Sequence, residues 1–448
     1  MPWKAFNPEI FARAITLRAS LARRLARPAQ VQTGPPPIIM AANERQEVLP
    51  AQDGLAPARD VTVIFLRWAF VRAVFHRGYV LASGLYLVIV AHLAASQLLV
   101  LGTVMSVTLL VSDLPTGVWS DAVSRKWPLV AGHIFLAAGM TMTGLVTAFP
   151  LLVIAQSLWG LGWGFSSGAD TAWITDELSQ PGRIDRVLAA RSRWDALGSA
   201  TGLILFGILG WAVGLAAAVV TSGAAMAALG LFVAARFSEN NFTPAQGRLW
   251  RASLAIFQRG IALARRDRQI MLMLVATMLI NGASMVALLF PLQLVNLGFP
   301  SNPVLWYTAV GVVSFAASAA ALRVVERRIA GPVAARRFYV VACSIGTLGL
   351  IMLAYAGSAV LGSAGVVLAS GVSFTVTRTV SVIWVNRRTT SDTRATVHSF
   401  LSQAECAGEI VSGIALAGLA RAVGIAGVLT IAGAVIVTTG VIITRGRG

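Results

Sequence analysis

The chain has 448 residues, of which 56% are hydrophobic and only 12% are charged, and its mean hydropathy is +0.75. A soluble domain of this length must cover its core with more polar surface than this composition supplies. The net charge of +18 would favour a nucleic-acid partner in a soluble protein. Here the basic residues flank long apolar segments, so the composition indicates a lipid bilayer as partner and excludes nucleic acid.

Residues 1–60 differ from the rest of the chain because they are polar and contain three consecutive prolines, Pro35 to Pro37. Arginines interrupt an apolar pattern between Glu9 and Arg27, which leaves open a disordered tail or a cationic helix on the membrane surface. Met40 is an alternative translation start. An apolar stretch followed by a small-residue cleavage site is not found here, so no signal peptide is expected. We therefore expect a cytoplasmic N-terminal extension.

Apolar segments with almost no charge follow one another along the remaining chain. Lipid requires the backbone groups of each segment to be paired within it, as in an α-helix. The alternation of polar and apolar residues that is typical of a membrane β-barrel is missing. The fold class is therefore an all-α membrane protein with about twelve transmembrane helices. These are expected near residues 70–94, 98–117, 127–147, 150–174, 192–210, 213–235, 269–293, 303–325, 337–356, 359–385, 396–419 and 423–443.

The longest polar connection between these segments, residues 237–267, divides them into two six-helix halves, 61–236 and 268–448. Of the 36 Lys and Arg, all but Arg378 and Arg421 lie near connections that this count places on one side. Such an excess of basic residues faces the cytoplasm. We therefore expect a protein of the cytoplasmic (inner) membrane with both termini and the connecting linker, partly helical around 250–266, inside.

An internal repeat supports the division into halves. Three sequence features recur after 210 or 211 positions, which is unlikely to arise by chance. They are the pairs Arg125-Lys126 and Arg336-Arg337, the residues Trp173 and Trp384, and the stretches Asp195 to Gly198 and Glu405 to Gly408. Two parallel repeats that face one another around a site at the membrane midplane are typical of transporters that work by alternating access.

The connection between the second and third expected helices carries Asp113, Gly117, Asp121, Arg125 and Lys126. The last four resemble the loop signature of the major facilitator superfamily, Gly-x-x-x-Asp-x-x-x-Arg-Arg/Lys. A glycine lets helices approach closely, and an acid followed by bases can exchange partners as a cytoplasmic mouth opens and closes. The resemblance implies the major facilitator fold and a gate formed by these five residues.

Further stretches look like uncharacterised bacterial permeases of the same superfamily, and the resemblance extends over residues 68–445. They are Gln156 to Glu177, Trp384 to Asn386 and Arg394 to Thr396. Many drug/proton antiporters of the superfamily have an arginine where Gln156 stands, and a Gly-Pro-Gly-Gly kink where this chain has only Gly198 and Gly202. These differences weigh against drug/proton antiport.

Charges inside the expected helices are costly in lipid and therefore point to function. Counting along the helices places Arg378 and Glu405 at roughly 12 and 15 Å from the inner boundary, so they can form a pair. Glu409 shares a face with Glu405 about 20 Å in, where the sequence offers no evident cation. A carboxyl in such a place can bind and release a proton. Candidates for proton or substrate coupling are therefore Glu409, Glu405, Arg378 and Asp170. A structural lock between the two helices is the alternative role for Arg378 and Glu405.

Other charges lie near the inner ends of the expected helices. His76 and Arg77 are expected to extend to the lipid headgroups. No metal ion or cofactor is expected, since the histidines show no metal-ligand spacing. A secondary gate network is expected from Asp176, Arg193, Asp195 and Arg394.

The sequence favours a secondary active transporter, coupled to protons, that moves a small molecule as a monomer; efflux and uptake both remain open. A facilitative permease without proton coupling is the main alternative. A phosphate-binding loop is missing, which argues against ATP hydrolysis. A membrane enzyme such as a lipid-linked transferase is disfavoured because the expected external connections are short. A sensor that has lost transport, with the N-terminal extension as its binding arm, is the remaining alternative.

Overall fold

The computed structural model describes residues 58–178, 180–244, 267–389 and 391–445. Most of the expected N-terminal extension and the helix expected at 250–266 therefore lie outside the described residues. Every regular element in the described part is a helix, and ten of the helices are long and apolar enough to cross a membrane. The chain is therefore a multi-pass membrane protein.

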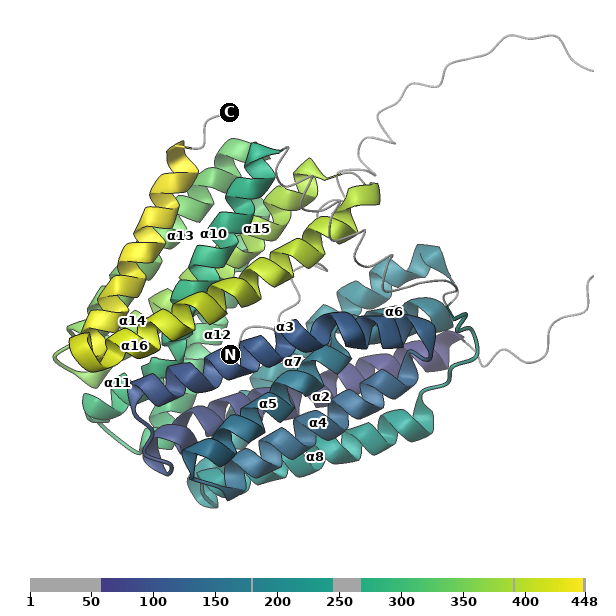
Figure 1. The fold of residues 1–448 in the computed structure, drawn as a ribbon, viewed down its shortest axis with the longest axis horizontal. Coiled ribbons are helices and arrows are strands. Elements are labelled where there is room, and N and C mark those ends of the chain that lie inside the picture. Colours follow the sequence, from purple (N-terminus) through teal and green to yellow (C-terminus); the bar gives the residue numbers. More distant parts are fainter. Residues whose placement is uncertain (1–57, 179, 245–266, 390, 446–448) are drawn as a thin grey trace, which may run out of the picture.

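The N-terminal part forms one bundle, coloured purple to teal in Figure 1. Gly168 and Gly214 have positive φ angles of 75° and 111°, which glycine adopts without strain, and they mark breaks between helices. The bundle consists of α2 (Ala58–Ile89), α3 (Ala95–Ala122), α4 (Lys126–Leu145), α5 (Phe149–Ser166), α6 (Ala169–Leu178), α7 (Pro181–Ala212) and α8 (Leu215–Arg236). The first helix thus begins well before the expected residue 70.

The C-terminal part forms a second bundle, coloured green to yellow. Its elements are α10 (Arg268–Ser284), η2 (Met285–Leu289), α11 (Phe290–Asn296), α12 (Pro303–Arg328), α13 (Gly331–Ala354), α14 (Ala359–Val366), the π-helical η3 (Val367–Phe374), α15 (Thr375–Arg388) and α16 (Ser391–Arg445). The last two expected spans both lie in α16, where Gly424 (φ 66°, ψ −178°) breaks the helical geometry and separates two arms.

Small residues set the helix spacing in both bundles. A Cβ on Gly198 of α7 would collide with the carbonyl oxygen of Phe70 on α2, and one on Gly408 of α16 would collide with that of Met278 on α10. In membranes, small residues allow such close backbone contact. Both glycines lie in the stretches that recur in the sequence, and each joins the corresponding pair of helices in its bundle.

The two bundles meet through α3 with α16 and through α7 with α12. We call the end where α3 stops and α4 starts the linker end, and the end where α2 stops and α3 starts the far end. A Cβ on Gly413 of α16 would meet Thr103 near the start of α3, and one on Gly207 near the end of α7 would meet Thr308 near the start of α12. These contacts lie in the far-end halves of the helices. Toward the linker end, α3 and α16 separate in Figure 1.

Candidate functional site

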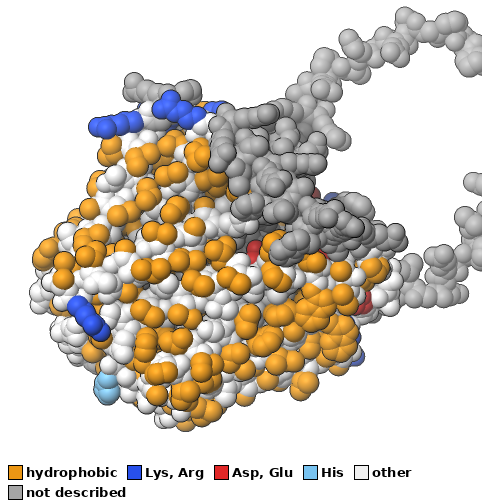
Figure 2. Space-filling view, viewed as in Figure 1, with side chains coloured by type: hydrophobic (Ala, Val, Ile, Leu, Met, Phe, Trp, Pro, Cys, Tyr) orange, Lys and Arg blue, Asp and Glu red, His pale blue; other side chains and the backbone are white. Residues whose placement is uncertain are grey.

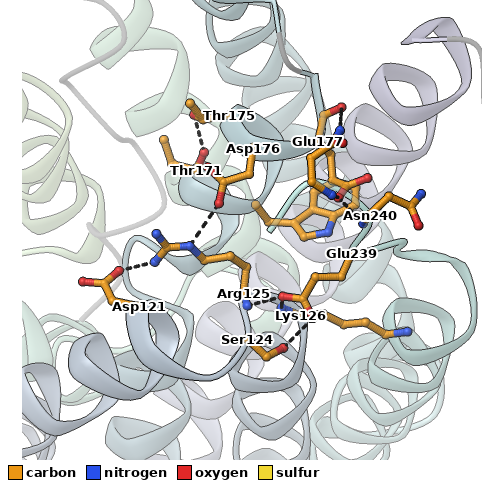
Figure 3. A network of polar contacts seen from close by, with 12 residues as sticks. Asp121, Ser124, Arg125, Lys126, Thr171, Thr175, Asp176, Glu177, Glu239 and Asn240 are labelled. Atoms are coloured by element: carbon orange, nitrogen blue, oxygen red, sulfur yellow. Dashed lines mark hydrogen bonds and ion pairs between the residues drawn. The ribbon is translucent and has the colours of Figure 1, made fainter. Parts of the chain in front are cut away.

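The gate loop at the linker end connects α3 to α4 along the chain, and an ion pair from Arg125 links it to α6 (Figure 3). Arg125 forms an ion pair with Asp121 one turn earlier, and its Nε lies 3.2 Å from Oδ2 of Asp176. The Asp121 side chain is 53% exposed, whereas that of Arg125 is 19% exposed. The Lys126 ammonium lies 5.6 Å from the ring centre of Trp127. The structure thus brings the gate-motif residues Asp121 and Arg125 together with Asp176, which was expected in the secondary network.

The glycine of this motif has a different surrounding from the expected one. A Cβ on Gly117 would meet nothing within 4 Å, so close helix approach does not explain this glycine. The close contacts between α3 and α5 come instead from Gly160 and Gly164, which face Met105 and Ser112. The Asp113 side chain is partly buried one turn before Gly117.

The Glu239 carboxylate caps the first turn of α4. It accepts hydrogen bonds from the backbone N–H of Arg125 and, at 3.2 Å, from that of Lys126, and its other oxygen accepts from Ser124 Oγ at 2.8 Å. The first N–H groups of a helix have no partner inside it, and negative charge is favourable there. Glu239 therefore ties the chain after α8 to the gate loop (Figure 3).

Glu177 at the end of α6 binds the segment after α8 that also contains Glu239. Its carboxylate accepts from Ser238 Oγ at 2.9 Å and from the backbone N–H of Asn240 at 2.7 Å. Phe237 is 1% exposed and stacks on Trp173 with ring centres 4.0 Å apart. The first residues of the expected linker are therefore packed on the N-terminal bundle.

A second charged network lies buried between α2, α6 and α7. Asp170 is hydrogen-bonded to Arg191, and its Oδ2 lies 3.7 Å from the guanidinium of Arg72. Arg191 Nε also lies 3.5 Å from Oδ2 of Asp195. Arg193, expected in the same gate network as Asp195, is exposed and faces away from it, because residues two apart lie on different faces of a helix whereas residues four apart share one.

Aromatic rings enclose the Arg72 guanidinium. It lies 5.3 Å from the ring centre of Trp68 and 5.0 Å from that of Trp163, within the range of cation–π attraction. Trp68 Nε1 donates to His133 Nε2 at 3.1 Å, so His133 Nδ1 carries the proton and donates to the Leu129 carbonyl at 2.7 Å. Both imidazole nitrogens are thus used by a neutral ring, and α2 is joined to α4.

The expectation that His76 extends to the headgroups is wrong. His76 is 4% exposed and packs against Trp159 and Trp163, with ring centres 5.9 and 4.9 Å away. Arg77, the next residue on α2, is partly buried. The aromatic surface of α5 provides the packing that favours burial of His76, and the sequence of α2 alone does not reveal it.

The Arg378 and Glu405 side chains form the expected pair between α15 and α16. Arg378 Nη2 donates to Glu405 Oε2 at 2.8 Å, and the two side chains are 19% and 9% exposed. A small, partly open pocket adjoins the pair. Its lining residues are Thr277, Ile280, Asn281, Thr377, Arg378, Ser381, Val382, Leu401 and Glu405.

Glu409 lies one turn from Glu405 and makes a contact between the two bundles. Ser106 Oγ of α3 donates to Glu409 Oε2 at 2.9 Å. Ser106 is 0% and Glu409 7% exposed. The same hydroxyl lies 3.0 Å from the carbonyl of Gly102, so its proton has two available acceptors. The Ser106 hydroxyl can therefore donate to Glu409 or to the Gly102 carbonyl, depending on its orientation and on whether the Glu409 carboxyl is ionised.

Several residues of these networks were not expected from the sequence, and the side chain of Arg394 lies outside those that the structure describes. The i, i+4 spacing of Arg191 and Asp195 could have indicated their ion pair from the sequence. Glu177 and Glu239 act on segments that are distant in the sequence, which spacing does not reveal. The residues missed are Arg72, Ser106, Glu177, Arg191 and Glu239.

Comparison with solved structures shows the same fold at low sequence identity. The nucleoside transporter NupG is 13% identical with a TM-score of 0.71, and the match covers 86% of this chain and 98% of that one. A POT family transporter in complex with 5-aminolevulinic acid is 12% identical with a TM-score of 0.68, covering 86% and 95%. A bacterial homologue of the human lysosomal transporter Spinster, in an inward-facing and unoccupied conformation, is 13% identical with a TM-score of 0.64, covering 87% and 96%.

A search of curated proteins finds no match to this chain. The sequence model of the Major Facilitator Superfamily matches residues 69–413, which is most of the chain. Membership of this family identifies a membrane transporter rather than an enzyme, and the solved structures show the same fold. The chain therefore belongs to the major facilitator superfamily.

Proposed function

We propose that this protein is a proton-coupled secondary transporter that moves a small molecule across the cytoplasmic membrane by alternating access between its two bundles. The observation that carries the proposal is the buried hydrogen bond between Ser106 and Glu409. It places an ionisable group at the contact between the bundles, where a change in its protonation acts directly on that contact.

The conformation fits one state of such a cycle. Contacts between the bundles lie toward the far end, as at Gly413 and Thr103. At the linker end, the ion pairs of Arg125 join elements of the N-terminal bundle to one another. If the basic linker end faces the cytoplasm, this is an inward-open state. The ten apolar helices do not include α2 and count α16 once. Adding α2 and counting the two arms of α16 as two spans gives twelve spans.

In the proposed cycle, the gate loop changes partners as the bundles rock. Asp121 is half exposed in this state, so its carboxylate is available to a group of the C-terminal bundle when the linker end closes. The segment held by Glu177 and Glu239 would move with the N-terminal bundle and keep the end of α8 fixed to the gate loop. Both bundles belong to one chain, so in this scheme the protein works as a monomer.

Protonation of Glu409 would accompany the opposite motion. An ionised carboxylate accepts the Ser106 hydroxyl proton, whereas a protonated one can itself donate and lets Ser106 bond to Gly102 within its own helix. Opening the far end exposes Glu409 to the other side of the membrane. Binding a proton on one side and releasing it on the other couples the gradient to the motion.

The substrate does not follow from the neighbours. NupG is a nucleoside transporter and the POT family structure holds 5-aminolevulinic acid, so the same fold serves different molecules. A facilitative permease is the alternative, and the matched charges of Asp170 with Arg191 and Glu405 with Arg378 favour it, because they leave those acids in stable pairs. In that case Glu409 would serve only to pack α16 on α3.

Proteoliposomes with an imposed pH gradient can separate these functions. We would incubate them with mixed sugars, nucleosides, amino acids and organic acids and measure accumulation by mass spectrometry. Glu409→Gln should abolish gradient-driven accumulation and retain exchange, whereas the exposed Glu326→Gln should behave like the wild type. Gradient-driven accumulation at the wild-type rate in Glu409→Gln would place the proton elsewhere, with Asp170 as the next candidate.

A further inference from the structure

We propose that the pocket beside Arg378 and Glu405 binds a hydroxyl group of a neutral, polyhydroxylated substrate such as a polyol or sugar. The pocket lies within the C-terminal bundle, between α10, α15 and α16. The identity of this ligand as the transported molecule rests on the proposed function, but its binding can be measured without transport.

Two polar residues of α10 carry unused hydrogen-bonding capacity in the pocket. Thr277 is 4% exposed, and its buried Oγ1 forms no hydrogen bond with the residues that the structure describes. Asn281, one turn later, donates from Nδ2 to the Thr277 carbonyl at 2.8 Å, which leaves its amide oxygen as an acceptor. A buried polar group without a partner is costly, so such groups commonly mark a place for a ligand or water.

The ion pair adds charged hydrogen-bonding groups without net charge. Glu405 receives Arg378 on Oε2, so its Oε1 can accept a further proton donor. Because the pair has no net charge, a single charge on a ligand is attracted by one member and repelled by the other, so the pair offers it little net Coulomb stabilisation. A hydroxyl both donates and accepts, and therefore suits an amide oxygen, a threonine hydroxyl and a neutral ion pair together.

The pocket admits a group rather than a whole molecule. Gly408 brings α16 against the backbone of α10 at Met278, which fixes the spacing between two of its walls. The volume that the centre of a water-sized sphere can occupy in it is about 10 Å³, which is room for one small polar group and far below the size of a complete ligand site. The rest of the substrate would extend out of the mouth.

Binding can be tested with the purified full-length protein in detergent. Xylitol, D-sorbitol and D-glucose would be the probes, with 1,5-diaminopentane and glutarate as charged controls, measured by thermal shift and by titration calorimetry. At least one polyol should bind, and Thr277→Val, which removes one hydroxyl at nearly constant volume, should weaken that binding about fivefold. Thr277→Ser should restore it.

Thr439→Val is the matched control, because Thr439 is a buried α16 threonine whose hydroxyl bonds to its own helix at Val435. It should bind the polyol like the wild type. The proposal is overturned if no polyol binds, if a charged control binds as well as the polyol, or if folded Thr277→Val retains wild-type affinity. If the protein transports a substrate but binds no polyol, the hydroxyl site is wrong and the proposed function stands. If it binds a polyol but transports nothing, the proposed function is wrong and the hydroxyl site stands.

Discussion

Ser106 of α3 and Glu409 of α16, 303 positions apart in the sequence, are joined by a hydrogen bond of 2.9 Å at the contact between the two bundles. Both groups are buried, so water competes little for either partner. The contact is therefore a place where a single proton can change how the bundles associate, and each side of it can be altered separately.

Ser106→Ala removes the donor and leaves the carboxylate in place. A hydrogen bond to a charged group contributes about 1.5 to 3 kcal/mol, so the far-end contact should weaken and the population with an open far end should increase. Spin labels at the start of α3 and near Gly424, where the two arms of α16 meet, would report this as longer distances. Ser222→Ala is the control, because Ser222 is equally buried but bonds to Ala218 within α8. Unchanged distances in Ser106→Ala would show that the bond does not hold the contact.

Asp121→Asn should leave membrane insertion and expression nearly intact but slow transport severely. The Asp121 carboxylate is half exposed here, so its charge contributes little to folding and is needed when the gate loop exchanges partners. Flux would be measured at equal amounts of protein in the membrane. A wild-type rate in the mutant would reduce this loop to a simple connection.

Arg378→Ala should be more harmful than the double change Arg378→Ala with Glu405→Ala. The single change leaves the buried Glu405 charge uncompensated, at a cost of about 3 to 5 kcal/mol, whereas the double change removes both charges. Thermal unfolding in detergent would give the order of stability. A single mutant at least as stable as the double mutant would show that the pair is not coupled energetically.

Glu239→Gln tests the attachment of the chain after α8 to the gate loop. The substitution keeps the size but removes the negative charge at the start of α4, which should cost about 0.5 to 2 kcal/mol locally. Hydrogen exchange of the amides of Arg125 and Lys126 should become faster. The exposed Glu326→Gln should leave the same amides unchanged. Equal protection in both variants would contradict a capping role for Glu239.

The sequence predicted the features that depend on local pattern. Long apolar segments led to helices, and matched depths along helices led to the Arg378–Glu405 pair. The Gly117 to Lys126 motif led to the gate loop, although the reason offered for its glycine is wrong, because a Cβ on Gly117 would meet no atom of another helix within 4 Å.

Features that depend on packing between distant segments were missed. Ser106 gives no signal in the sequence, because its role comes from α16 packing on α3. The burial of His76 depends on two tryptophans of α5. Glu239 was assigned to the linker because a polar stretch after a helix usually faces solvent, whereas here its carboxylate caps α4. These contacts are non-local, so residue type and spacing do not determine them.

Two neighbouring arginines of α7 differ in burial, and the sequence pointed to Arg193 rather than to the buried Arg191. Arg191 is 6% exposed and forms ion pairs with Asp170 and Asp195, whereas Arg193 is exposed. Arg191→Ala should destabilise the protein by about 3 to 5 kcal/mol, because Arg72 is then the only cation near Asp170 among the residues that the structure describes, and it lies farther away. Arg193→Ala should change stability by less than about 0.5 kcal/mol.

Thermal unfolding and the yield of protein in the membrane would measure both variants. Arg191→Lys is the informative third variant, because it keeps the charge but cannot reach Asp170 and Asp195 with one planar group. We expect it to recover part of the stability. If Arg193→Ala is the more harmful change, Arg193 belongs with Asp195 to the gate network that the sequence predicted. The buried network around Asp170 would then belong to a different conformation of the transport cycle.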